Sequence, residues 1–384
     1  MVGVMENRTL SAAEAFLPGE YILDYLDAKG WTQDDLAEVV GRSRTHINRL
    51  IAGKTAINSN TANELADAFG TSPELWMNLQ TAFELADVSK KNREISRKAK
   101  IYSKVPIREL QKRGWIAKDG SLDLLEASVC RFLDISNIDD EAIIQMAAKK
   151  STNYGTNSPS HVAWYKRAFK LASCLTSVRY DDSKFPQLVD DLLKLANDTA
   201  DLRRIPALLA QYGIRILFVE HLLKSKLDGA AFWLDDDSPV VVLTLRLDRI
   251  DNFWHVLIHE LIHIKYRDGV IFDDDLLSNS NDENLPDCEK RANEEARQLL
   301  VPLEKMQSFI ARHKPLYYRE KVIQFAKARG VHPGIVVGQL QRRDELDWSQ
   351  LRKLLVGVRE HLVGTTLTDG WGDYVNLEKG KNDN

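Results

Sequence analysis

The stretch that most constrains this chain is His259-Glu260-Leu261-Ile262-His263, inside an apolar run over residues 253–264. Such a run predicts a buried helix. Residues four apart project from one face of a helix, so the imidazoles of His259 and His263 can reach a single metal ion. Glu260 then lies beside the ion, where its carboxylate can take a proton from a water molecule. The motif therefore predicts a hydrolytic zinc site, because burying these groups without partners would be unfavourable.

The third ligand has to come from another part of the chain. A helix is predicted over residues 289–302, and its small and apolar residues share one face. Glu289 falls within about 35° of that face and is the best-placed third ligand if the face packs on the zinc helix. His255 is the alternative, but it would lie about 12 Å from His263 along a straight helix. We expect His255 to pack beside the ligands or to bind one of their partners.

Near the N-terminus, residues 18–88 are typical of short helices joined by tight turns. Pro18 and Gly30 bracket the first predicted helix. Thr32 and Ser43 are placed as N-caps of the next two predicted helices, over residues 33–40 and 44–51. Two short helices separated by a turn with glycine indicate a helix-turn-helix.

Local charge supports a nucleic-acid partner more than the net charge of −4 does. Residues 42–63 contain four basic residues and no acidic one. A positive face of this kind suits a phosphate backbone. The alternative is a small helical bundle with a solvated basic face. The candidate DNA-binding residues are Arg42, Arg44, Thr45, His46, Asn48, Arg49 and Lys54, of which Arg44, Thr45, His46 and Asn48 can read base edges while Arg49 and Lys54 hold phosphates.

Four motifs in this region carry a family resemblance: Pro18-Gly19-Glu20, Thr32-Gln33-x-x-Leu36-Ala37, Ile47-Asn48-Arg49-Leu50-Ile51-x-Gly53-Lys54 and the run from Thr71 to Gln80. Over about residues 15–88 the chain resembles the HigA-type antitoxin branch of the Xre/lambda-repressor family. The resemblance implies a lambda-repressor-like bundle that binds double-stranded operator DNA. It also implies a homodimer on a palindromic site and autoregulation of an operon.

Between the two motif regions, residues 89–104 form a basic run that we interpret as a solvated linker rather than as an extension along DNA. Residues 105–200 are predicted to be helical, including a helix over 140–148, with a break rich in Ser, Asn, Gly and Pro at 151–160. Three β-rich runs at 213–219, 229–234 and 239–245 then precede the zinc helix.

These patterns predict a mainly α fold with a small β-sheet (α+β) in three parts. Residues 1–88 are the helix-turn-helix domain, 89–200 the basic linker and helical connector, and 201–384 the zinc domain. Its polar tail from Gly364 is expected to fray.

Composition narrows the cellular setting. The three cysteines are widely spaced and form neither a disulfide framework nor a Cys-x-x-Cys metal motif. The N-terminal segment lacks a basic region followed by an apolar one, and no apolar segment is long enough to span a membrane. The sequence therefore predicts a cytoplasmic protein without a membrane partner.

The zinc region carries a second resemblance. Its motifs are Asp248-Arg249-Ile250-Asp251-Asn252-Phe253-Trp254, His259-Glu260-x-x-His263, Glu289-x-x-Ala292-Asn293-x-x-Ala296 and Leu299-Leu300-Val301-Pro302. Over about residues 200–360 the chain resembles the ImmA/IrrE zinc metallopeptidases. The resemblance implies a zincin-like domain with Zn²⁺ on His259, His263 and Glu289 and with Glu260 as general base. The chain departs from that family at Ile262, where a small residue is common, and at Glu294-Glu295, which replace an aromatic residue.

Together these features predict a DNA-binding regulator or antitoxin joined to a zinc metalloendopeptidase-like domain that cleaves a partner repressor or a cognate toxin. Two alternatives stay open. In the first, the zincin-like domain is a non-catalytic sensor that binds a toxin or a ligand. In the second, the chain is a repressor that cleaves itself in the basic linker.

Overall fold

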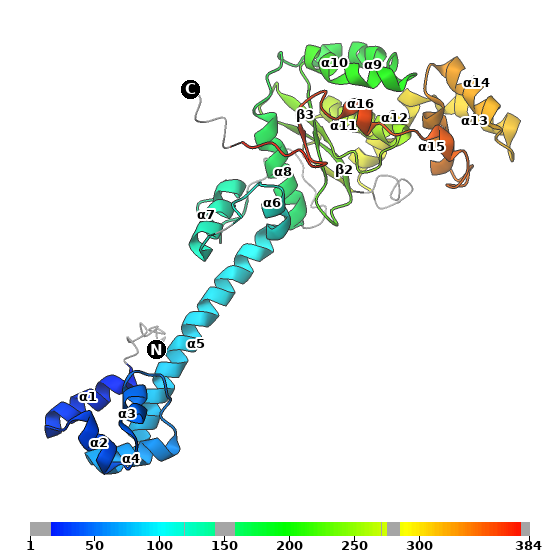
Figure 1. Cartoon of the computed structure of the whole chain (residues 1–384). Coiled ribbons are helices and arrows are strands. Elements are labelled where there is room, and N and C mark those ends of the chain that lie inside the picture. The colour runs from blue at the N-terminus through cyan, green and yellow to red at the C-terminus, as the bar shows by residue number, and fades with distance from the viewer. Residues whose placement is uncertain (1–16, 119, 143–157, 270, 275–284, 378–384) are drawn as a thin grey trace, which may run out of the picture. The chain divides into compact units, whose positions relative to one another are not determined.

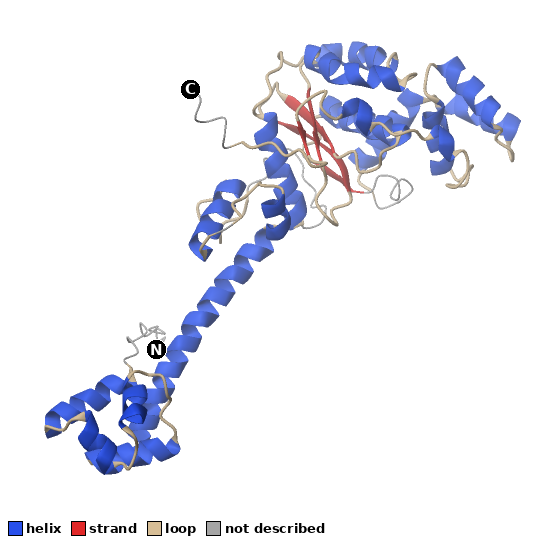
Figure 2. Cartoon of the chain, in the orientation of Figure 1, coloured by secondary structure: helices blue, strands red, loops and turns tan. Residues whose placement is uncertain are grey.

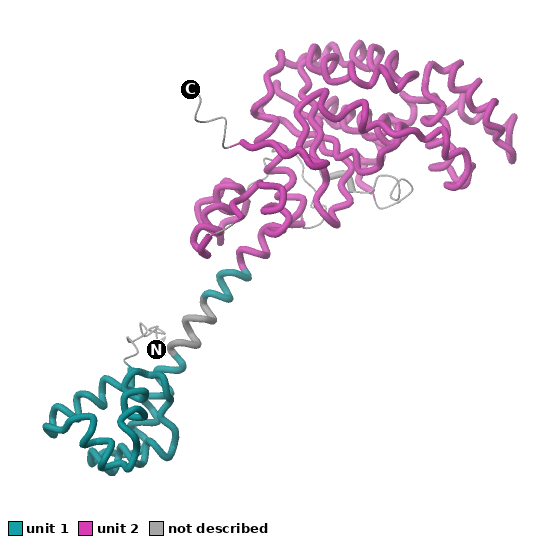
Figure 3. Tube along the Cα trace, viewed as in Figure 1, with its two compact units in different colours: residues 1–99 teal, residues 100–384 magenta. Residues whose placement is uncertain are grey.

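In the computed structural model of the chain, residues 17–118, 120–142, 158–269, 271–274 and 285–377 are described. They belong to two compact units, residues 1–99 and 100–384 (Figure 3). The helix predicted over 140–148 lies mostly outside the described residues. The predicted boundaries at residues 88 and 200 stay predictions.

The N-terminal unit is a bundle of short helices. They are α1 (Pro18–Lys29), α2 (Gln33–Val39), α3 (Arg44–Ile51), α4 (Ser59–Phe69) and the first part of α5 (Pro73–Lys104). The Thr32 hydroxyl accepts a hydrogen bond from the Asp35 amide, and the Ser43 hydroxyl accepts one from the His46 amide, each at 3.2 Å. Both predicted N-caps are thus confirmed, and α2 and α3 form the helix-turn-helix pair. Their apolar faces pack on a core that includes Phe69 and the fully buried Trp76.

The basic segment over residues 89–104 is helical, because α5 continues through it (Figure 2), and its role as a solvated linker stays a prediction. The segment contains no glycine or proline and is rich in lysine and arginine, which are good helix formers. Ile101, near the end of α5, is buried in a core of the C-terminal unit.

The C-terminal unit is built around a five-stranded mixed sheet in the order β4-β2-β3-β1-β5. β1 pairs with β3 and β5 in parallel, and β2 pairs with β3 and β4 in antiparallel fashion. The strands are β1 (Arg215–Val219), β2 (Leu227–Trp233), β3 (Pro239–Leu243), β4 (Ile271–Asp274) and β5 (Thr368–Asp369). The three strands predicted before the zinc helix are confirmed, and β4 and β5 are additions that the sequence did not predict.

Helices cover both faces of this sheet (Figure 1). Alternate residues of β1 show the division, since Ile216 packs with α11 in one core and Leu217 with α8 in the other. A sheet buried on both faces needs continuous apolar strands, as β3 has in Val240, Val241 and Val242. The helices of this unit are α6 (Ile107–Lys112), α7 (Leu122–Leu133), α8 (Pro159–Ala172), α9 (Phe185–Leu193), α10 (Ile205–Gln211), α11 (Ile250–Tyr266), α12 (Asp287–Leu300), α13 (Leu303–His313), α14 (Arg319–Arg329), α15 (Pro333–Arg342) and α16 (Arg359–Leu362).

The polar tail corrects a prediction, because its described part is packed and does not fray. β5 extends the sheet beside β1, and Asp369 is fully buried. Its carboxylate accepts hydrogen bonds from Nε and a terminal nitrogen of Arg167 in α8, at 2.9 and 3.0 Å. Polar composition was misleading here, since the charge that predicted exposure is neutralised by a partner 202 residues away.

The fold is therefore mostly helical with a small mixed sheet, as the sequence predicts, and its N-terminal part is a helix-turn-helix. The zincin-like assignment of the C-terminal unit stays a prediction. Among the described residues, none of the helices has both the length and the apolarity that crossing a membrane requires.

Candidate functional site

Helix α11 carries the central motif and is buried along nearly its whole length. It packs against α12, α15 and β2. The residue that precedes it as N-cap is Arg249, and Asp251 lies in the first turn without a capping bond to the backbone. The Asp251 carboxylate instead accepts two hydrogen bonds at 3.0 Å from the Arg249 guanidinium.

Three predicted ligands are brought together where α11 faces α12. The Nε2 atoms of His259 and His263 are 3.0 Å apart. The Glu289 carboxylate reaches both, with Oε2 3.2 Å from His259 Nε2 and Oε1 3.1 Å from His263 Nε2. All three side chains are buried, and their ligand atoms lie within 4.8 Å of one another. Among the described residues, this is the group of histidine, cysteine and acidic side chains with metal-ligand spacing.

These residues fit a zinc ion. Around tetrahedral zinc with nitrogen and oxygen ligands, neighbouring ligand atoms lie about 3.3 Å apart. The three contacts of 3.0 to 3.2 Å approach that spacing. The donor set of two imidazoles and one carboxylate is the set used by hydrolytic zinc enzymes, and it leaves a fourth position for water or substrate.

The electrostatics of the cluster favour charged partners. Burial raises the pKa of Glu289, but hydrogen bonds and charge from His259 and His263 outweigh it and hold the pKa well below its usual range. Burial lowers the pKa of His263, yet the hydrogen bonds to Asp268 and Glu289 leave it raised. A carboxylate that stays ionised while buried is the form that binds a cation.

Glu260 projects from α11 toward β2, where the sequence provides room for it. A Cβ atom on Gly229 would lie 2.5 Å from Glu260 Oε1 and 2.9 Å from Val256 Cγ1. Any side chain larger than hydrogen at position 229 would thus displace the carboxylate. Glycine inside a strand often marks such a close approach.

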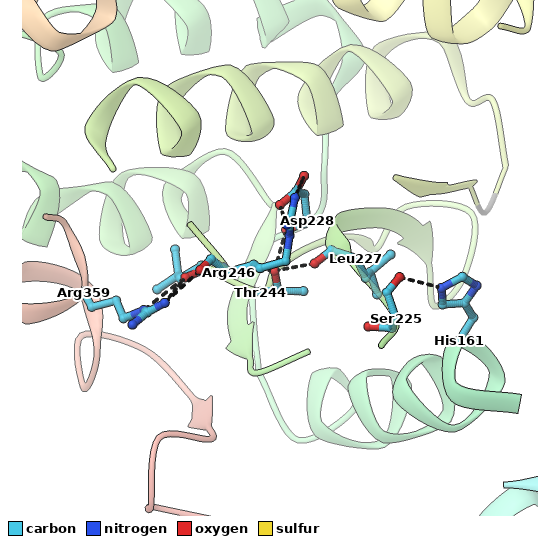
Figure 4. Close-up of polar contacts among 8 residues, drawn as sticks. His161, Ser225, Leu227, Asp228, Thr244, Arg246 and Arg359 are labelled. Atoms are coloured by element: carbon cyan, nitrogen blue, oxygen red, sulfur yellow. Dashed lines mark hydrogen bonds and ion pairs between the residues drawn. The ribbon is translucent and has the colours of Figure 1, made fainter. Parts of the chain in front are cut away.

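The beginning of β2 is fixed by polar contacts next to Gly229 (Figure 4). Asp228 is buried and accepts hydrogen bonds from Nε and a terminal nitrogen of Arg246, at 3.0 and 3.1 Å. The Thr244 hydroxyl donates to the Leu227 carbonyl at 2.7 Å. These bonds fix the backbone at the beginning of β2, against which the Glu260 carboxylate lies.

His255 does not join the ligand cluster. Its Nε2 lies 3.1 Å from Oδ1 of Asn293 on α12, one helical turn beyond Glu289. Burial and the nearby charge of Arg342 lower the pKa of His255 well below its usual value, so it is neutral. As the sequence predicts, His255 packs beside the ligands.

The predicted DNA-binding residues lie around α3 of the N-terminal unit. Thr45, Asn48, Arg49 and Lys54 are exposed, and His46 is half-buried. Arg44 is exposed and makes a 3.1 Å ion pair with Asp34 of α2, a contact that solvent weakens. Arg42 differs, because Nε and a terminal nitrogen both donate to the Glu64 carboxylate, at 3.1 and 2.6 Å. Arg42 therefore joins the turn to α4, and its role with DNA stays a prediction.

Sequence reasoning missed two residues beside the metal cluster. Asp268 lies 3.0 Å from Nδ1 of His263, and Arg291 donates to both Asp268 carboxylate oxygens at 2.6 and 2.7 Å. Nothing in the local sequence distinguishes Asp268, because several other acidic residues follow it in the same segment. Gly229 did carry a signal, as an isolated glycine at the start of an apolar strand.

Known proteins match the N-terminal part of the chain. The helix-turn-helix family model matches residues 22–76. The chain is 33% identical over 73 residues to the HTH-type transcriptional regulator YddM of Escherichia coli, covering 19% of this chain and 78% of that protein. It is 35% identical over 72 residues to antitoxin HigA-1 of Vibrio cholerae, covering 19% of this chain and 68% of the antitoxin.

A solved structure also matches about a fifth of the chain. It is an addiction module antidote protein of the HigA family from Coxiella burnetii, 28% identical, with 22% of this chain and 94% of that chain covered and a TM-score of 0.21.

Proposed function

Because this chain belongs, through its N-terminal region, to the family of helix-turn-helix transcriptional regulators and antitoxins, we propose that it binds operator DNA and represses its own operon. It does so as a homodimer on a palindromic site, where the two copies of α3 enter successive major grooves. A toxin encoded beside it is the expected protein partner.

One observation carries this proposal, the exposed polar and basic surface of α3. Its exposed side chains are of the types that contact base edges and phosphates. Arg44 makes an exposed ion pair with Asp34, which a phosphate can replace. Arg49 and Lys54 follow with no acidic residue between positions 42 and 63 to oppose them.

The test is fluorescence anisotropy with a duplex carrying the promoter region of the chain's own gene. We expect Arg44→Ala to weaken binding by about 1–3 kcal/mol and Lys54→Ala to reduce the salt dependence by about one phosphate contact. Lys29→Ala is the matched control, since Lys29 is exposed at the end of α1 beside Trp31 and is not a predicted contact. An unchanged affinity in Arg44→Ala would mean that the reading helix is misplaced.

We propose, second, that the C-terminal unit holds a zinc ion on His259, His263 and Glu289 and hydrolyses a peptide bond in a partner protein. The convergence of three buried ligand atoms supports this proposal. A zinc ion bound there would supply Lewis-acid chemistry, polarising a carbonyl and activating water.

The residues of the chain would perform the remaining steps. Glu260 accepts a proton from a water molecule in the site as the water oxygen bonds to the peptide carbonyl carbon, and it returns that proton to the leaving amine as the C–N bond breaks. Gly229 allows the Glu260 carboxylate to lie against β2. His259, His263 and Glu289 fix the geometry from two packed helices, so the catalytic groups do not have to be assembled when substrate binds.

Zinc content and partner cleavage test the second proposal. We expect one zinc ion per purified chain and its loss in Glu289→Ala. Zinc-loaded protein is then incubated with the toxin encoded beside it or with a co-encoded repressor. Cleavage that disappears in Glu260→Gln supports the hydrolase, whereas an intact partner in a stable complex supports a non-catalytic binding domain. An N-terminal fragment of the chain itself, ending in the basic half of α5, supports self-cleavage.

A further inference from the structure

One of the three ligands, His263, is also linked to two charged residues outside the ligand cluster, Asp268 and Arg291. Nε2 of His263 faces the other two ligands. The second ring nitrogen, Nδ1, is buried and therefore needs a hydrogen-bond partner of its own. That partner is Asp268, whose Oδ2 is 3.0 Å from Nδ1. The Asp268 side chain is 13% exposed and the His263 side chain 1%, so water competes little for the contact.

The end of α11 explains how Asp268 reaches this position. Arg267 adopts a left-handed conformation with φ 52° and ψ 46°, which turns the chain back on the helix. The amide of Asp268 then donates to the His263 carbonyl at 3.2 Å. Backbone and side chain of Asp268 thus both bind the same residue, one turn of helix before it.

Arg291 completes the arrangement from the other ligand-bearing helix. One of its terminal nitrogens donates to both carboxylate oxygens of Asp268, at 2.6 and 2.7 Å. Its guanidinium lies 4.0 Å from the ring centroid of Tyr266. Arg291 is two residues after Glu289, so α12 supplies both a ligand and the group that holds the partner of another ligand.

We propose that Asp268, clamped by Arg291, is a positioning residue that fixes the tautomer and ring orientation of His263 and thereby sets the metal affinity of the site. This inference rests on the proposed zinc site. The Asp268 carboxylate keeps the proton of neutral His263 on Nδ1, which leaves the Nε2 lone pair for the ion. Arg291 prevents the carboxylate from rotating toward solvent.

Zinc affinity measured by competition with a chromogenic chelator tests the proposal in the full-length protein. We expect Asp268→Ala to weaken zinc binding about 10- to 100-fold and Asp268→Asn, which keeps an acceptor but loses the charge, to weaken it less. Arg291→Met should weaken it by a smaller factor, since the carboxylate remains. The matched control is Glu295→Gln on the same helix, which loses the charge that pairs with Lys265 but no contact to a ligand, and which should leave the affinity unchanged.

A second readout separates positioning from general destabilisation. In ¹⁵N-labelled apo protein at neutral pH, the Nδ1 proton of His263 should give a downfield imidazole resonance that disappears in Asp268→Ala and persists in Glu295→Gln. If Asp268→Ala does not fold, the zinc affinity and the imidazole resonance are both measured in Asp268→Asn instead. Affinity within twofold of wild type in Asp268→Ala would overturn the inference, provided that Glu289→Ala abolishes binding. Absence of zinc binding in the wild type would instead overturn the proposed zinc site itself.

Discussion

Replacing Gly229 with alanine tests the placement of Glu260 most directly. The new methyl group would lie 2.5 Å from Glu260 Oε1, whereas ordinary contacts begin at 3.4 Å, so the carboxylate must retreat by about 0.9 Å. The strand cannot move instead, because β2 is hydrogen-bonded to β3 on one side and to β4 on the other. Overpacking of this kind costs about 1–3 kcal/mol. We expect the free energy of unfolding of the C-terminal unit, measured in urea, to fall by that amount.

A double-mutant cycle isolates the contact. In a Glu260→Ala background the contact with Oε1 is gone, while Val256 Cγ1, at 2.9 Å, and the Val242 carbonyl oxygen, at 3.2 Å, still lie close to the alanine at position 229. The penalty of Gly229→Ala should therefore be smaller in this background, by a coupling of about 1 kcal/mol. Zinc affinity should stay unchanged, while the proposed hydrolysis should drop about 100-fold because Glu260, its proposed base, is displaced by about 1 Å. Additive effects of the two substitutions, within about 0.3 kcal/mol, would refute the proposed packing of Glu260 on β2.

Three further predictions concern stability. Arg249→Met should lower the free energy of unfolding by about 3 kcal/mol, because it leaves the buried Asp251 without its bidentate partner. Arg342→Met, which removes a longer contact of 3.7 Å to Asp251, should change it by less than about 1 kcal/mol. Burial lowers the pKa of Arg342 to about 10, so this arginine is poorly stabilised as a cation, and equal losses in the two variants would contradict the assignment. Hydrogen bonds from Lys194, Tyr212 and Gln187 lower the pKa of Asp191 from 3.8 to about 2, so its contribution is present above pH 4 and is lost as the pH falls toward 2. The difference in urea midpoint between wild type and Asp191→Asn should accordingly shrink between pH 5 and pH 3, and a constant difference would argue against the lowered pKa. Finally, Gly19→Ala places a methyl group 2.0 Å from the Ile51 carbonyl oxygen and should destabilise the N-terminal unit by at least about 1–3 kcal/mol, measured by its thermal transition.

The sequence determined the features that depend on neighbours along the chain. The four-residue spacing of His259 and His263 requires only that the segment be helical, and the apolar run over 253–264 makes it so. Thr32 and Ser43 cap the helices that they precede because a cap needs only the next three residues. Glu289 could be assigned to the face that meets α11 because helical periodicity orders a helix into faces.

Only the tertiary structure decided the contacts between segments that no local rule connects. Asp268 reaches His263 because Arg267 turns left-handed, and its partner Arg291 lies 23 residues further along the chain. Gly229 meets Glu260 through the register of β2 against α11, and Asp369 is buried because Arg167 lies opposite it. The physical reason is that helical faces follow from a period of a few residues, whereas the partner of a buried charge depends on how the sheet and helices pack.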